Sequence, residues 1–370
     1  MGICGAPVSI RRGSEMNTVT RSTRASATPA MDLASLARNP VIVAWEVTRA
    51  CGYRCTHCRA DAQPLAAPGQ LDEAEARDLI DELATFDGTT LVITGGDPML
   101  RRDLVDITRH ATARGLPVAL TPSATPQVTE ARLGELVDAG LSRIAISLDG
   151  ATAATHDGMR GIRGSFDRTI RILRMARDMG IPTQVNTTVT RLTAPDLDRI
   201  AAIVELVGAS MWSVFFLVPV GRGSAADVLG AEETEVVLNR LADLAPTLPY
   251  RLKVTEAPSY RRVLAQRGVE PGPPVNAGRG FMFISHDGDV QPSGFLTIPA
   301  GNVRHCSPVV LYRGSPLFRA LRDPALLTGK CASCRWARAC GGSRARALTM
   351  TGLLFGDDPT CPHIPEGELC

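Results

Sequence analysis

The sequence predicts an α/β protein: a partial (β/α)6 barrel of the TIM type, followed by a cysteine-rich C-terminal extension. Strand-like and helix-like segments alternate between residues 41 and 220. Tandem units of this kind build a parallel sheet that is covered by helices. Most of the 10 cysteines fall into two groups, one directly after the first expected strand and one near the C-terminus.

The expected strands are short runs of apolar and β-branched residues. They cover residues 41–47, 89–96, 116–123, 142–150, 182–190 and 209–220. The expected helices have amphipathic periodicity, acidic residues near their starts, and glycines such as Gly115 and Gly140 at their ends. They cover residues 71–86, 102–115, 128–140, 164–180 and 194–208.

Polar residues, glycine or proline recur where the strands end, namely at Cys51, Gly95, Ser123, Asp149, Asn186 and Pro219. In parallel barrels this edge is where binding sites are built. After Gly221 the alternation is expected to stop, with a β-hairpin at residues 281–295 turning on Asp287-Gly288. The expected divisions are a disordered tail (1–38), the barrel (39–225) and the C-terminal region (226–370).

Composition limits the class of function. The formal net charge is +2 and no basic block stands out, which argues against a nucleic-acid surface. The longest apolar run is much shorter than the roughly 20 residues of a membrane span, so no membrane association is expected. No hydrophobic signal segment is evident, and a cytoplasmic location is expected. Residues 1–30 could pass for a transit peptide, but a tail, or a later start at Met16 or Met31, is preferred.

Three cysteines lie close together in the stretch CGYRCTHC, at Cys51, Cys55 and Cys58. A structural zinc ion usually takes four ligands, and His57 is a poor fourth because it adjoins Cys58. Three thiolates instead suit an iron–sulfur cube that keeps one iron open for a substrate or cofactor. A structural metal site remains the alternative on spacing alone.

A second motif, Gly95-Gly96-Asp97-Pro98, follows about 40 residues later at the end of the second strand. Together, CxxxCxxC with Tyr53 before its second cysteine and this GGEP-like motif resemble the radical S-adenosylmethionine (SAM) superfamily. Asp97 stands where that family usually has glutamate. The resemblance implies a [4Fe–4S] cluster on Cys51, Cys55 and Cys58 that binds SAM, cleaves it reductively and yields a 5′-deoxyadenosyl radical.

The same resemblance implies further SAM contacts. The glycines would let the backbone approach the methionyl amine, and Asp97 would orient that loop. Other positions that resemble SAM-contacting positions of the family are Ser123, Ser147, Asp149, Arg160, Asn186, Leu217 and Val218. Strand-end caps, or a solvated charge at Arg160, are the alternatives for these positions.

The second cysteine group comprises Cys331, Cys334, Cys340 and Cys361. Four thiolates can close a zinc site or fully ligate an iron–sulfur cluster. Next to a radical SAM barrel, the pattern resembles a SPASM/twitch extension, although with fewer cysteines. It implies one auxiliary [4Fe–4S] cluster on these four residues, with Cys306 as a reserve ligand.

The C-terminal ending resembles enzymes that remodel tetrapyrrole side chains, so an oxidative modification of a tetrapyrrole side chain or small metabolite is expected. A maturase of a ribosomally made peptide is the alternative, and a non-catalytic iron–sulfur carrier or zinc scaffold is the alternative of another class. A flavodoxin- or ferredoxin-type reductant is implied. Arg344 and Arg346 are candidates for pairing with substrate carboxylates or for facing the auxiliary cluster or solvent.

Overall fold

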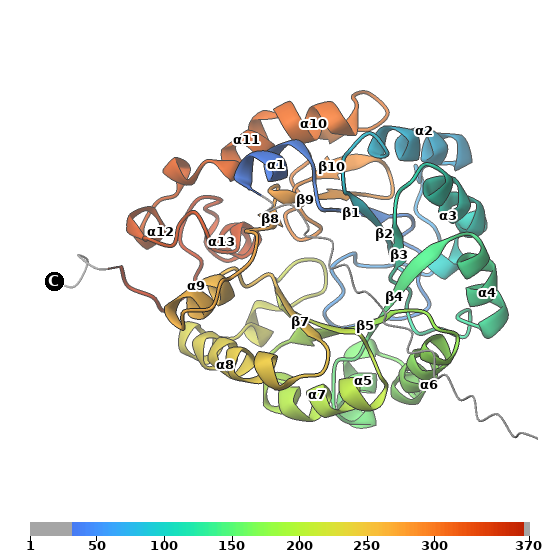
Figure 1. Cartoon of the computed structure of the whole chain (residues 1–370), viewed down its shortest axis with the longest axis horizontal. Coiled ribbons are helices and arrows are strands. Elements are labelled where there is room, and N and C mark those ends of the chain that lie inside the picture. Colours follow the sequence, from blue (N-terminus) through green and yellow to red (C-terminus); the bar gives the residue numbers. More distant parts are fainter. Residues whose placement is uncertain (1–31, 366–370) are drawn as a thin grey trace, which may run out of the picture. The chain divides into compact units, whose positions relative to one another are not determined.

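The computed structural model describes residues 32–365. Within this part of the chain, strands β1 to β7 are all parallel and follow one another around the sheet in chain order (Figure 1). The strands are β1 (Ile42–Glu46), β2 (Thr90–Thr94), β3 (Val118–Leu120), β4 (Leu141–Ser147), β5 (Thr183–Val189), β6 (Met211–Phe216), β7 (Arg251–Thr255), β8 (Asn276–Ala277), β9 (Gly280–Ile284), β10 (Asp289–Gln291) and β11 (Gly301–Asn302).

Helices surround this curved sheet on its outside (Figure 1). They are α1 (Leu33–Arg38), α2 (Glu73–Leu83), α3 (Leu104–Ala113), α4 (Glu130–Asp138), α5 (Ala153–Arg160), α6 (Ser165–Asp178), α7 (Leu197–Leu206), α8 (Ala231–Leu244), α9 (Ser259–Gln266), α10 (Pro308–Gly314), α11 (Pro316–Arg322), α12 (Lys330–Ser333) and α13 (Arg344–Thr351). The first barrel helix, α2, begins with a capping box between Asp72 and Glu75, which satisfies backbone donors at the helix start.

The main core lies between the strands and the outer helices. Side chains alternate between the two faces of a strand, so every second residue points outward. Trp45, Ile93, Ile144 and Trp212 are such residues, and none is measurably exposed. This alternation leaves the intervening residues on the inner face of the barrel, where the sites are built.

The predicted α/β class with a parallel sheet is confirmed, and so is the hairpin, whose strands β9 and β10 pair antiparallel. The expectation that the alternation stops at Gly221 is wrong. The α8 helix is followed by β7, which pairs in parallel with β6. Its sequence, RLKVT, is short and carries charged residues at alternate positions. It therefore lacks the apolar run by which the other strands were predicted.

The C-terminal region shares the sheet with the barrel, because β9 pairs in parallel with β1. The boundary at residue 225 therefore stays a prediction. Most of the predicted N-terminal tail lies outside the described residues, but its last part forms α1, in which Leu36 is buried. Within residues 32–365, no helix combines the length and apolar character that crossing a bilayer requires.

Candidate active site

A cavity opens at the carboxyl ends of the barrel strands. Its empty volume is about 1020 Å³, counted with its open mouth. Many of the residues predicted from the sequence line it: Cys51, Tyr53, Cys55, Cys58, Gly95, Gly96, Ser123, Ser147, Arg160 and Leu217. Other predicted residues do not line it: Asp97, Pro98, Asp149, Asn186 and Val218.

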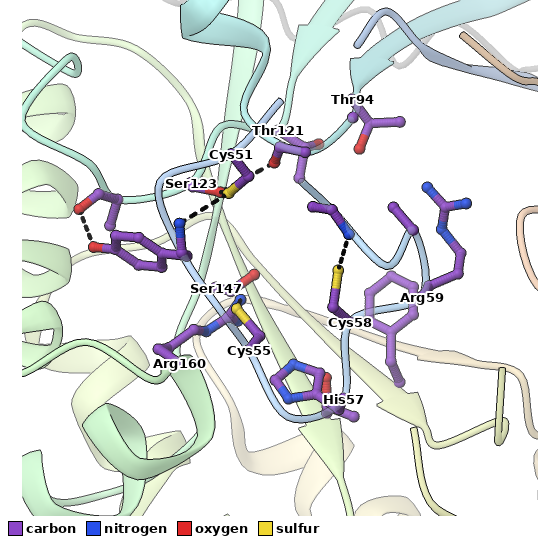
Figure 2. Close-up of a pocket in the computed structure, with 18 of the residues that line it drawn as sticks. Cys51, Cys55, His57, Cys58, Arg59, Thr94, Thr121, Ser123, Ser147 and Arg160 are labelled. Carbon is purple, nitrogen blue, oxygen red and sulfur yellow. Dashed lines mark hydrogen bonds between the residues drawn. The ribbon is translucent and has the colours of Figure 1, made fainter. Parts of the chain in front are cut away.

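All three thiols of the first group have hydrogen-bond partners (Figure 2). Cys51 Sγ accepts from the Tyr53 amide at 3.3 Å and lies 3.4 Å from Ser123 Oγ. Cys55 Sγ lies 3.7 Å from Arg160 Nη1. Burial raises the pKa of the Cys51 thiol, while the contacts with Ser123 and Tyr53 oppose that rise. Such donors suit sulfur atoms that carry negative charge.

Contacts distant in sequence hold the cysteine loop in place. Arg222 Nε donates to the Cys55 carbonyl at 2.9 Å, and Arg168 donates to the Tyr53 hydroxyl at 3.1 Å. Arg59 pairs with buried Glu46 at 2.7 Å. These contacts come from different parts of the barrel, so the positions of the thiols depend on the whole fold.

The Gly95-Gly96 pair lies against the start of the cysteine loop. The Gly96 amide donates to the Thr48 carbonyl at 2.7 Å, and the Asp97 amide donates to the Ala50 carbonyl at 2.6 Å. A Cβ atom on Gly96 would lie 2.6 Å from the Arg49 carbonyl oxygen and closer still to that of Ala50. The glycines therefore permit close packing against the cysteine loop, a role the motif alone did not reveal.

We expect Gly96→Ala to destabilise the protein by about 1–3 kcal/mol, because the new methyl group meets backbone that cannot rotate away. Displacement of the cysteine loop should also weaken SAM binding. Gly134→Ala in α4 is the matched control, since no atom of the described residues lies within 4 Å of its Cβ position. This substitution should stabilise the protein by up to about 1 kcal/mol. Chemical denaturation and SAM titration measure both effects, and equal stability of the two variants would contradict this account.

Asp97 is fully buried and is held by the Thr125 hydroxyl at 2.7 Å and the Met99 amide at 3.2 Å. Burial raises the pKa of its carboxyl group. Asp97 thus shapes the loop after β2 from behind the cavity. Val218 lies in an apolar cluster with Ala345 of α13, and Asn186 accepts from Gln184 at 2.7 Å. The predicted SAM contacts of these residues stay predictions.

Asp149 also acts from behind the cavity wall. It is fully buried, forms an ion pair with Arg160, and accepts from the Thr188 amide at 2.6 Å. Burial alone would raise the pKa of its carboxyl group, but Arg160 and the nearby His57, 3.4 Å away, hold that pKa below its ordinary value. Asp149 therefore positions Arg160, whose side chain lines the cavity.

The second cysteine group gathers around a smaller cavity of about 420 Å³. Cys331, Cys334, Cys340 and Cys361 all line it. The Gly342 amide donates to Cys340 Sγ at 3.4 Å. Cys306 does not line this cavity and instead packs partly buried against the main core.

Both thiol sets offer the kind of donor that an iron–sulfur cluster takes. Among residues 32–365, no group of three or more His, Cys, Asp or Glu side chains closes around one metal ion. The donor set is also suitable, because each site offers thiols with backbone donors close by.

Some cavity residues were missed by sequence reasoning. Phe215 and Phe295 contribute apolar wall, and Arg59 and His57 lie beside the thiols (Figure 2). Phe215 could have been found from strand alternation, because it shares the inner face of β6 with Ser213. Phe295 could not, since it reaches the cavity from the C-terminal region.

The two arginines that are candidates for substrate binding both make contacts within the protein. Arg346 of α13 is 1% exposed, pairs with Asp358 and donates to the Leu217 and Glu256 carbonyls. Arg344 is buried and donates to the Gly356 carbonyl at 2.6 Å. Arg346 therefore anchors α13 within the protein. Arg344 uses only its Nη1 for such a contact, and among residues 32–365 its buried Nε and Nη2 have no hydrogen-bond partner, while its charge lowers the pKa of the Cys331 thiol against the effect of burial.

Comparison with known proteins agrees with this geometry. Residues 45–206 match the radical SAM superfamily. An AdoMet-dependent heme synthase of Oleidesulfovibrio alaskensis is 40% identical, over 88% of this chain and 87% of its own. The mycofactocin maturase MftC of Mycobacterium tuberculosis is 32% identical, over 87% of this chain and 83% of its own.

The fold is also similar to that of a protein of known structure. The structure of Streptococcus suis SuiB bound to the precursor peptide SuiA matches with a TM-score of 0.70 at 15% identity, covering 88% of this chain and 76% of that one. The long match to the heme synthase, together with the cavity that joins the thiols to Gly95-Gly96, identifies the family. The chain is an enzyme that belongs to the radical SAM superfamily.

Proposed function

We propose that this enzyme oxidises a side chain of a tetrapyrrole, using SAM bound at a [4Fe–4S] cluster on Cys51, Cys55 and Cys58. The observation that carries the proposal is the cavity in which these thiols face Gly95-Gly96 and Arg160. The similarity to a heme synthase along nearly the whole length of both chains favours the tetrapyrrole. A flavodoxin- or ferredoxin-type protein is the proposed reductant.

When bound, the cluster and SAM supply a 5′-deoxyadenosyl radical that abstracts a hydrogen atom from the substrate. The protein's part is to bind and orient. Arg160 offers a cation for the SAM carboxylate, and its buried Nε has no hydrogen-bond partner in the described part of the chain. Ser123 and Ser147 offer hydroxyl groups, while Phe215 and Leu217 offer an apolar wall for the adenine. Such a wall also keeps water from the reacting atoms.

The second thiol group is proposed to hold one auxiliary [4Fe–4S] cluster. Its four thiols would occupy every iron, so that no iron would be left to bind a substrate. Removal of a hydrogen atom and carbon dioxide from a propionate leaves a vinyl group and one electron, which needs an acceptor. Cys331, Cys334, Cys340 and Cys361 would hold the group suited to take up this electron, so that SAM would be consumed rather than regenerated.

A peptide maturase is the second candidate, since MftC is 32% identical over most of both chains. The decisive experiment incubates the anaerobic, iron- and sulfide-reconstituted enzyme with dithionite, SAM and either Fe-coproporphyrin III or size-fractionated cell extract. We expect the porphyrin to be converted, with at least one 5′-deoxyadenosine formed for each side chain oxidised. Substoichiometric 5′-deoxyadenosine would contradict SAM consumption. Stimulation only by a peptide fraction would favour the maturase.

A further inference from the structure

A group of cations lies on the inner face of the barrel, away from the cysteine loop. Arg143 lies on β4, and Arg251 and Lys253 lie on β7. Their neighbours Ile144, Leu252 and Val254 pack in or against the outer core. Because strand side chains alternate, the three cations face inward. The same alternation places Ser147, which lines the first cavity, on the inner face of β4 with Arg143.

The cations converge although they come from different strands. Arg143 Nη1 lies 3.9 Å from Met211 Sδ on β6 and thus extends across β5. Lys253 is in register with Ser213, two residues after Met211. Arg261 of α9 adds a fourth positive charge near Lys253, and its buried Nη1 has no hydrogen-bond partner among residues 32–365.

The positive charge of this group is unbalanced within the part of the chain that the structure describes. Among the described residues, Arg143, Arg251 and Lys253 form no ion pair. The inner positions of β1 to β7 carry a single carboxylate, Glu46, which already pairs with Arg59 at 2.7 Å and His286 at 3.2 Å. Residues 32–365 therefore leave an uncompensated positive charge on the inner face of the barrel.

Lys253 remains accessible to an anionic ligand. The Lys253 residue is exposed to solvent, although many protein atoms lie around its amine. Burial, together with the Arg251, Arg143 and Arg261 cations, lowers the pKa of its amine to about 8. A bound anion would relieve this repulsion and favour the protonated amine.

The opposite part of the inner wall differs in character. Its side chains are small or apolar, such as Ala44, Val92, Ala119 and Phe281. Val92, Ala119 and Phe281 are partly exposed. In a closed barrel, inward side chains interdigitate and fill the centre; here small residues and partial exposure leave the inner wall accessible. The wall is thus apolar on β1 to β3 and β9, and basic on β4 and β7.

We propose that Arg143, Arg251 and Lys253 bind carboxylate groups of the substrate, while the apolar wall takes its flat ring system. This inference rests on the proposed tetrapyrrole function and adds the residues that would anchor the substrate. At about 3.3 Å per residue, Arg143 lies about 13 Å along β4 from Ser147 at the cavity. A macrocycle held by some of its carboxylates could therefore present another side chain to the cavity.

Binding of Fe-coproporphyrin III, followed by its visible absorbance under anaerobic conditions, tests the inference. We expect Arg143→Gln and Lys253→Met each to weaken binding by about 10- to 100-fold, as for loss of a charged hydrogen bond. The matched control Arg109→Gln, on the exposed face of α3, should bind like the wild type. With the tetramethyl ester, which has no carboxylates, all four proteins should bind alike.

Formation of 5′-deoxyadenosine without substrate should stay unchanged in both variants, because neither residue lines the SAM cavity. A fall in that reaction would place these cations in SAM binding and overturn the inference. If the wild type and both variants bind the porphyrin equally, the anchoring role is wrong while the tetrapyrrole function stands. If the wild type binds no porphyrin but is stimulated by a peptide, the proposed function fails as well.

Discussion

Cys51→Ala is expected to reduce 5′-deoxyadenosine formation to the level of a protein-free control. Cys51 is one of three thiols that line the cavity, and the donors that support it come from Tyr53 and Ser123. With two thiols left, the proposed cluster would lose one protein ligand and SAM its binding iron. Because the second thiol group is intact, iron content should fall from about eight to about four per chain.

Cys334→Ala is the matched control, because it removes one thiol from the other cavity. It should also lower iron to about four per chain, but it should keep substrate-free 5′-deoxyadenosine formation. Iron and sulfide analysis, with chromatographic assay of 5′-deoxyadenosine, distinguishes the two variants. Full SAM cleavage by Cys51→Ala, or its loss in Cys334→Ala with the first cluster loaded, would contradict the assignment of the two thiol groups.

Arg346→Met is expected to destabilise the protein by about 3–5 kcal/mol, the usual cost of breaking a buried ion pair from one side. Its partner Asp358 is also 1% exposed and would keep a buried charge without a cation. The Leu217 and Glu256 carbonyls would also lose a donor. Since Leu217 lines the first cavity and Asp358 the second, both sites should be affected.

Denaturant unfolding of the reconstituted protein measures this effect. The double variant Arg346→Met with Asp358→Asn should recover part of the lost stability, because it removes the unpaired charge. Arg109→Met breaks an exposed pair with Asp106 and should cost less than about 1 kcal/mol. If Arg346→Met were no more costly than Arg109→Met, the buried pair would not anchor α13.

The chemistry of the protein was predicted from short local motifs. The spacing of Cys51, Cys55 and Cys58, together with Gly95-Gly96, identified the family, because iron–sulfur ligation and close backbone contact demand particular residues at particular positions. The strands with continuous apolar runs could also be predicted from the sequence. β7 was missed because RLKVT is short and its inward residues Arg251 and Lys253 are charged and exposed. The sequence therefore lacks the apolar run that marks a buried strand.

Only the tertiary structure shows the contacts that connect these motifs to the rest of the protein. Asp97 and Asp149 proved to support the cavity from behind, and Arg346 proved to be a buried link rather than a substrate ligand. The inner cations Arg143 and Lys253 are 110 residues apart in the chain, yet they share one barrel interior. The sequence gives the identity of each side chain and the alternation of neighbouring side chains between the two faces of a strand. Pairing between strands that are distant in the chain determines which charged side chains lie close together. That pairing depends on the register of the sheet, which the packing of the whole core fixes.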